Sequence, residues 1–185
     1  MSNFLARIKE RAQMEKKTIV LAEGEEIRTV KAAEMVLKEG IANIILLGNA
    51  EKIKALAVGL DIEAATIIDP EKADNLQEFA DKFYEMRKAK GMTPDKALET
   101  MKNVLYYGVM MVKLDLADGM VAGAVNSTAN VLRPCLQILK TAPGTKLVSA
   151  FFVMVVPNCE YGHNGTFIYA DSGLNENPDA EAVSE

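Results

Sequence analysis

An alternation of short apolar runs with amphipathic helical patterns constrains the fold of this chain most strongly. Apolar runs of strand length occur at 18–22, 43–47 and 66–68, and apolar residues at helical spacing, as in Ile27–Glu39, lie between the first two. Strands that alternate with helices form a parallel sheet whose faces the helices cover. The sequence therefore predicts an α/β fold built on a parallel sheet.

Three further helices are expected from the same patterns, over the ranges 50–58, 69–91 and 97–114. The second of them is expected to start at Asp69-Pro70, because proline is favoured in the first helical turn. Its apolar residues recur on one side, which is typical of a helix that packs against a core.

The pattern changes beyond residue 143. Residues 147–156 are apolar on both faces, as in a central strand, and 166–170 form another strand. The polar loop between them contains Asn164-Gly165, a dipeptide typical of hairpin turns. We therefore expect an antiparallel excursion here.

This change predicts two domains. Residues 1–143 form an α/β domain, and 144–185 form the beginning of a second, incomplete domain. A further helix start is expected at Asn177-Pro178, with a capping residue followed by proline.

Composition and charge exclude several functions. The net charge of −5 argues against nucleic acid or an anionic membrane as a partner. The longest apolar stretch is too short to span a bilayer, and the N-terminal sequence MSNFLARIKERAQ does not resemble a signal peptide. With two cysteines, one histidine and no CxxC motif, neither a metal site nor a disulfide framework is expected. We expect a cytoplasmic protein with reduced thiols.

The segment DGMVAGAVNSTANVLRPCLQILK contains the most informative motif. Residues 120–124 are expected to form a buried strand, and Asn126, Ser127 or Thr128 could each cap the helix that follows. Free N–H groups at a helix start, beside hydroxyls and with Arg133 further on, suit a small oxyanion such as phosphate. The alternative is an ordinary cap with an arginine held by a structural carboxylate, and the pattern leaves both open.

The start of that helix is ambiguous as well. Pro134 disfavours helical geometry in the residue before it, so the helix could begin near Pro134 and leave Arg133 in the loop. Neither GxGxxG nor GxxxxGK[ST] occurs, so a dinucleotide fold and a P-loop are unsupported.

Simpler interpretations are favoured for other polar residues. The acidic run 23–26 is expected to be a capping turn, although a carboxylate pair for acid–base chemistry remains an alternative. The pattern favours a solvated cation at a helix end for Arg87, a surface loop for His163 and a packed thiol for Cys135.

The run GMVAGAVNSTANVLRPCLQILKTAPGTKLVSAFFVM resembles the phosphate acetyltransferases, within the phosphate acetyl/butyryltransferase family. Further matching blocks, in the family's order, are LAEGEEIRTVKAAEMVLKEGIANIILLGN, FYEMRKAKGMTPDKA, YYGVMMVKLDLADGMVAGA and YADSGLNENPDAEAVSE. The resemblance spans the whole chain. It implies the two-domain architecture of the isocitrate and isopropylmalate dehydrogenases, with the second domain truncated here.

The resemblance implies reversible acetyl transfer: acetyl-CoA + phosphate ⇌ acetyl phosphate + CoA. Coenzyme A is then a co-substrate, no cofactor is tightly bound, and the protein is a homodimer. Together with the motif, it predicts catalytic roles for Arg133 and Ser127 and substrate contacts for Thr128 and Asn126. It also implies that Arg87 recognises coenzyme A. In the family the base that deprotonates the thiol comes from the C-terminal part, and no position here matches it.

Three alternatives remain open. The chain could be a catalytically incomplete fragment of such an enzyme, or it could belong to a phosphate butyryltransferase. Dehydrogenases of the isocitrate type share the architecture, but they need metal-binding aspartates, and the sequence shows no such cluster.

Overall fold

The computed structural model describes residues 3–170 and 179–180. The chain divides into two compact units, one of Ala12–Lys140 and the other of Met1–Arg11 with Thr141–Glu185. The first helix, α1, spans Asn3–Met14. The helix start predicted at Asn177-Pro178 lies outside the described residues.

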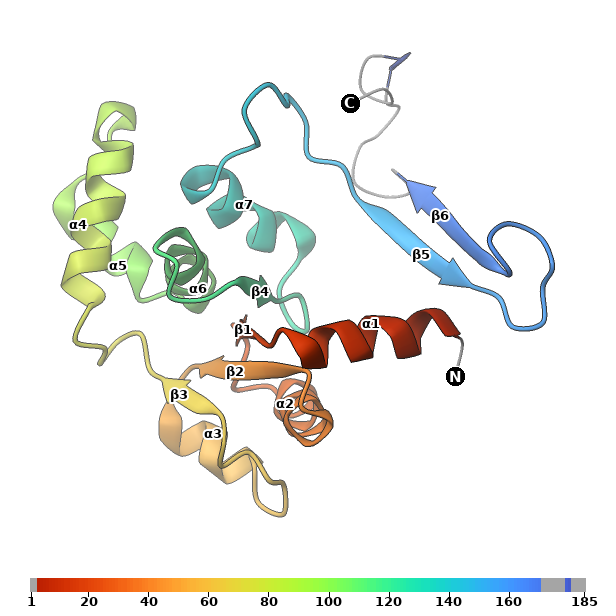
Figure 1. Ribbon diagram of the computed structural model, residues 1–185. Coiled ribbons are helices and arrows are strands. Elements are labelled where there is room, and N and C mark those ends of the chain that lie inside the picture. The colour runs from red at the N-terminus through yellow and green to blue at the C-terminus, as the bar shows by residue number, and fades with distance from the viewer. Residues whose placement is uncertain (1–2, 171–178, 181–185) are drawn as a thin grey trace. The chain divides into compact units, whose positions relative to one another are not determined.

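The larger unit is built on a parallel four-stranded sheet in the order β3-β2-β1-β4 (Figure 1). Its strands are β1 (Lys17–Leu21), β2 (Ala42–Leu47), β3 (Thr66–Ile68) and β4 (Gly119–Val121). All three strand pairings are parallel, and β1 lies between β2 and β4. The predicted α/β fold with a parallel sheet is confirmed.

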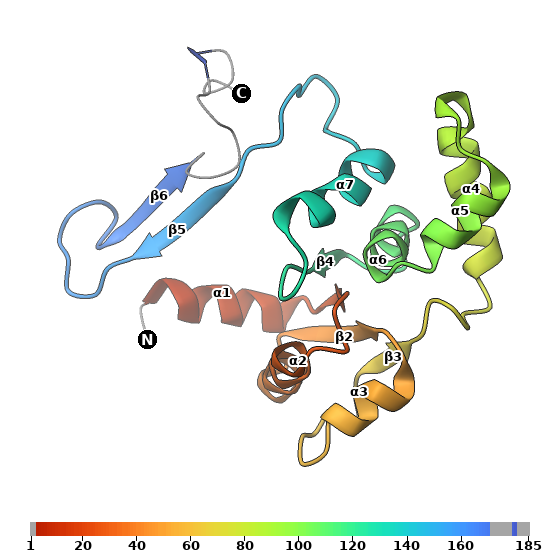
Figure 2. The ribbon, with the colours of Figure 1, turned by 180° about the vertical axis from the view of Figure 1, so that it is seen from behind.

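Helices cover both faces of this sheet (Figures 1 and 2). One face carries α2 (Ile27–Glu39) and α3 (Ala50–Leu56). The other carries α6 (Val104–Lys113) and α7 (Thr128–Ile138), with α4 (Leu76–Arg87) and α5 (Pro94–Met101) packed beside them.

The core is divided by the sheet into two clusters, because successive strand residues point to opposite faces. Val20 and Leu47 lie in the cluster on the α6 side, where the rings of Phe79 and Tyr107 are 4.9 Å apart. Leu21 and its neighbours lie in the other cluster, against α2 and α3. Both faces are therefore apolar, as is usual for a parallel sheet.

The predicted start of the long helix at Asp69-Pro70 is wrong. The Asp69 carboxylate accepts the N–H of Glu71 at 3.1 Å, which makes a local turn, and α4 begins only at Leu76. Asp-Pro suits such a turn as well as it suits a helix start, so the dipeptide could not decide between them. At its other end α4 stops at Arg87, and a short 3₁₀ turn over Lys88–Lys90 follows.

The expected helix over 97–114 is two helices. The Asn103 side chain accepts the N–H groups of Leu105 and Tyr106 at 3.0 and 3.4 Å, and so caps α6. A capping asparagine interrupts a helix because its side chain replaces the preceding turn as hydrogen-bond acceptor.

The smaller unit contains an antiparallel hairpin of β5 (Phe151–Val155) and β6 (Thr166–Ala170), as predicted. Asn164 and Gly165 have positive φ values of 50° and 81°, as the two central residues of a type I′ hairpin turn do. Among the described residues β5 pairs with β6 alone, so its expected place as a central strand is wrong. Both faces of the hairpin leave large apolar side chains exposed.

Candidate active site

The loop between β4 and α7 does not present its N–H groups to solvent. Gly123 and Ala124 donate to one oxygen of Glu23 at 2.8 and 2.6 Å, and Val125 and Asn126 donate to the other at 3.0 and 2.8 Å. The expected strand over 120–124 ends at Val121, because the chain turns here to surround this carboxylate. Of the residues predicted to bind an external phosphate, Asn126 therefore donates to an internal anion instead. We call this arrangement the Glu23 clasp.

Glu23 is 6% exposed, and the side-chain amide of Asn126 adds a fifth hydrogen bond at 2.9 Å. Burial raises the pKa of the Glu23 carboxyl, but the bonds from Asn126 and the loop N–H groups together outweigh it and lower the pKa to about 2. Glu23 is thus ionised at neutral pH. It is a weak base, and the predicted acid–base alternative for this residue is disfavoured.

The order of the strands explains how Glu23 reaches the loop. Glu23 follows β1, and β4 is the neighbouring parallel strand, so the residues after both strands meet at one edge of the sheet. Gly24 allows the chain to pass close to β2: a Cβ there would lie 2.6 Å from the Leu47 carbonyl oxygen.

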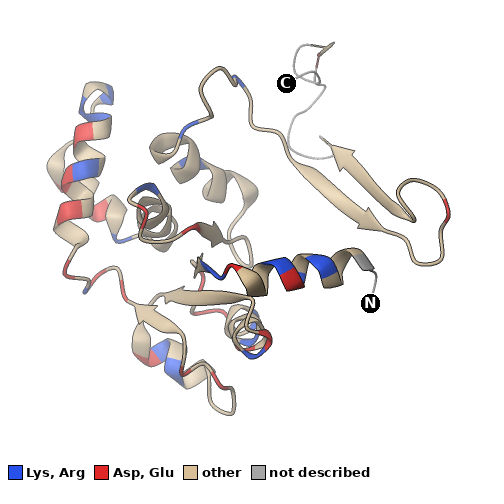
Figure 3. Ribbon diagram, in the orientation of Figure 1, with Lys and Arg blue, Asp and Glu red and all other residues tan. Residues whose placement is uncertain are grey.

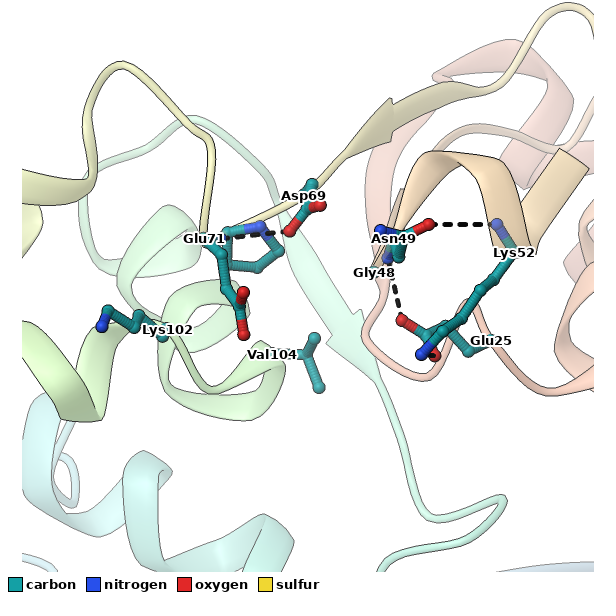
Figure 4. A pocket seen from close by; sticks show the side chains of 9 residues that line it. Glu25, Gly48, Asn49, Lys52, Asp69, Glu71, Lys102 and Val104 are labelled. Carbon is teal, nitrogen blue, oxygen red and sulfur yellow. Dashed lines mark hydrogen bonds and ion pairs between the residues drawn. The ribbon is translucent and has the colours of Figure 1, made fainter.

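The acidic residues next to Glu23 have separate tasks. Glu26 caps α2, as the predicted capping turn requires, and forms an ion pair with Arg28 at 2.7 Å. Glu25 accepts from the Asn49 N–H and pairs with Lys52, at 2.9 and 2.8 Å, in a hollow of about 160 Å³ at the ends of β1, β2 and β3 (Figure 4). None of the residues predicted to bind substrate lines this hollow.

At the start of α7 the capping residue is Ser127, whose Oγ accepts the N–H of Asn130 at 3.4 Å. Thr128 is the first helical residue, and the helix continues past Pro134. The alternative start near Pro134 is therefore wrong. The helix begins after its cap at Ser127, well before Pro134, and Pro134 is itself buried.

Arg87 lies on α4 and Arg133 on α7, and the positive charge of each influences the pKa of Tyr106. Burial raises the pKa of Tyr106, on α6, and the positive charges of Arg133 and then Arg87 oppose that rise. The Tyr106 hydroxyl donates to the side-chain Oε1 of Gln137, on α7, at 3.2 Å. We call Arg87 and Arg133 the arginine pair.

The arginine pair lacks an anionic partner within the described ranges. Arg133 is exposed and Arg87 is half-buried, and the Nε of Arg87 is buried without any hydrogen-bond acceptor. The solvated cation favoured by the pattern does not describe Arg87, and no carboxylate of the described part holds Arg133. The helices around Tyr106 are poor in charge: α6 contains Lys113 alone and α7 contains Arg133 alone (Figure 3). A buried, unpaired guanidinium nitrogen is costly and is usually matched by a ligand or partner.

Cys135 is a packed thiol, as predicted. Its Sγ donates to the Val131 carbonyl at 3.3 Å, and burial raises its pKa. His163 is exposed in the hairpin loop, also as predicted. Within the described ranges, no group of side chains is suited to a metal ion, and no helix combines the length and apolar character needed to cross a membrane.

Comparison with known proteins is consistent along the whole chain. A family model described as phosphate acetyl/butaryl transferase matches residues 3–185. The phosphate acetyltransferase of Acetivibrio thermocellus is 63% identical over 99% of this chain, and that of Thermoanaerobacterium thermosaccharolyticum is 54% identical over 98%. These alignments cover 55% and 56% of the two relatives, so the chain spans about half the length of the curated relatives it matches.

Solved structures give the same result. A phosphotransacetylase from Streptococcus pyogenes matches with a TM-score of 0.89 and 34% identity, over 100% of this chain and 56% of that one. The EutD phosphotransacetylase from Staphylococcus aureus matches with a TM-score of 0.86 and 32% identity, over 98% and 54%. From the matched family model and these relatives, the chain belongs to the phosphate acetyl/butaryl transferase family and corresponds to its N-terminal part.

Proposed function

We propose that the protein to which this chain belongs transfers an acetyl group between coenzyme A and inorganic phosphate. The names of its relatives support acetyl transfer, at up to 63% identity. The observation in the structure that carries the proposal is the arginine pair: the charges of both guanidinium groups act on Tyr106, and neither group has a carboxylate partner among the described residues. Both substrates of this reaction carry phosphate groups, which guanidinium groups bind well.

In this proposal Arg133 binds the phosphate that accepts or leaves the acetyl group, and Arg87 binds a phosphate of coenzyme A. Two cations whose charges act on the same tyrosine would allow two anionic substrates to approach each other and would stabilise negative charge that develops during transfer. The hydroxyls of Ser127 and Thr128, at the start of α7, are offered as further donors. The amide of Asn126 already donates to Glu23, so we assign this residue to the loop and not to the substrate.

The reaction also needs a base for the thiol of coenzyme A. Glu23 is unsuited to that role because its pKa is about 2. We propose that the base comes from the rest of the family-length protein. The 185-residue chain would then bind substrate groups without completing turnover.

We propose further that the protein is a cytoplasmic homodimer. Both cysteines are free, which suits a reducing compartment. A phosphate butyryltransferase is the second candidate, because the matched family model includes butyryl transfer.

The test is phosphate-dependent release of thiol from acyl-CoA by the protein translated from the complete reading frame. We expect acetyl-CoA to be used in preference to butyryl-CoA, with acetyl phosphate as the second product. Preference for butyryl-CoA would select the second candidate, and the absence of any phosphate-dependent release would refute both. Light scattering of the same sample tests the homodimer.

A further inference from the structure

The loop that leads into α7 is held from two sides. The Glu23 clasp engages its N–H groups, and the Nη2 of Arg28 donates to the Ala124 carbonyl at 2.7 Å. Arg28 is itself held by Glu26. Glu23 lies in the turn after β1 and Arg28 in the first turn of α2, so this connection fixes the short loop after the neighbouring strand.

The clasp is the stronger restraint on the start of α7. The hydrogen bond that Ser127 makes as cap is long, at 3.4 Å, whereas the bonds to Glu23 next to it measure 2.6 to 3.0 Å and involve a full negative charge. The far end of α7 is anchored by Ile138, which is buried in the core. The direction of the helix is thus set by the core at one end and by Glu23 at the other.

A change in that direction would move Arg133. At 1.5 Å per residue Arg133 lies about 7.5 Å along the helix from the anchored Ile138, so a tilt of about 10° about that end displaces it by about 1.3 Å. Displacements of about 1 Å in a binding group are enough to impair catalysis strongly.

We propose that Glu23 is a positioning residue for the anion site of the arginine pair. By binding four consecutive N–H groups of the loop, it orients α7 and so sets the position of Arg133. The loop before the helix start thus holds a permanent internal anion, which orients the site instead of occupying it. This inference rests on the proposed function.

The experiment compares Glu23→Gln and Glu23→Asp with wild type, in the protein from the complete reading frame. We expect Glu23→Gln to raise the KM for phosphate at least tenfold while circular dichroism shows an intact fold. Glu23→Asp, which keeps the charge, should recover part of the loss. A purely structural role would instead reduce kcat through loss of folded protein and leave KM unchanged.

The matched control is Glu34→Gln. Glu34 also accepts a loop N–H, that of Asp61 at 2.9 Å, but it lies on α2 far from this loop in the chain, so KM should not change. Arg133→Ala separates the two proposals. An unchanged phosphate KM in Arg133→Ala overturns the proposed function, whereas a raised KM there with unchanged KM in both Glu23 variants overturns the positioning role alone.

A third variant tests the positioning role if the Glu23 variants do not fold. Arg28→Ala removes the hydrogen bond that an exposed side chain donates to the Ala124 carbonyl, and it leaves the buried carboxylate of Glu23 in place. If neither Glu23 variant folds, a phosphate KM raised about threefold in Arg28→Ala supports the positioning role, and an unchanged KM overturns it.

Discussion

Two charged regions of the larger unit differ in one respect. At the Glu23 clasp, donors and anion both come from the chain, and every charge is matched. At the arginine pair, the charges of two cations act on Tyr106, and the described residues supply no anion. The predicted anion motif overlaps the first region only at Asn126, whereas the buried nitrogen without an acceptor, the Nε of Arg87, lies in the second. A ligand site is thus indicated by polar groups that the fold leaves unsatisfied, more than by a local motif.

The largest expected effect comes from testing the 185-residue chain, which contains both regions, without the rest of the family-length protein. The 185-residue chain alone should show at least ~1,000-fold less thiol release from acetyl-CoA than the complete protein, because we place the base for the thiol outside this chain. The measurement is thiol release in phosphate buffer by both proteins. Full activity of the short chain would mean that an acidic residue within it serves as the base.

Next in size is the effect of Arg133→Ala in the complete protein. We expect kcat/KM for phosphate to fall by at least ~100-fold, because a charge-assisted contact to a developing anion is lost. Steady-state kinetics with varied phosphate measures it, and Lys113→Ala, a cation on α6, serves as control. If the two variants behave alike, the contrast between matched and unmatched charge has no functional meaning.

Arg87→Gln should have a smaller and more selective effect. We expect the affinity for coenzyme A to fall roughly tenfold, as for loss of one charged hydrogen bond, with phosphate binding spared. Calorimetric titration with coenzyme A and dephospho-CoA shows which phosphate is involved, with Lys90→Gln as the neighbouring control. Equal loss for phosphate and coenzyme A would show that the pair binds a single anion.

The last prediction concerns the stability of the fold at the clasp, and no effect on the chemical step. The pKa of Glu23 falls from 4.5 to about 2 on folding, which corresponds to about 3 kcal/mol of stability. Because the folded pKa is the lower one, this contribution is present above pH 4.5 and is lost as the pH falls towards about 2. Denaturant unfolding of wild type and Glu23→Gln should therefore differ at pH 7 and converge near pH 2 to 3. A constant difference across this range would show that Glu23 is not the titrating group.

Prediction from the sequence succeeded where signals are local. The helix Ile27–Glu39 and the strand Thr66–Ile68 have the predicted bounds, because the spacing of their apolar residues and the turn residues beside them define them. It failed at Asp69-Pro70, which serves a turn and a helix start equally well, and at Asn103, whose capping side chain splits a continuous apolar pattern.

The candidate site shows the same division. The residue types of the motif and the cap at Ser127 could be named from the sequence, and the resemblance supplied Arg87. The partner of the loop could not be named, because Glu23 and Asn126 are 103 positions apart. Their contact depends on β1 lying next to β4, which no local pattern specifies.

By itself, then, the sequence determined the fold class, the family and the presence of an anion motif after a strand. The tertiary structure alone decided which anion that motif holds and which cations remain without one. The physical reason is that helix and strand patterns report interactions between near neighbours in the chain, whereas the pairing of charges depends on strand order and helix packing.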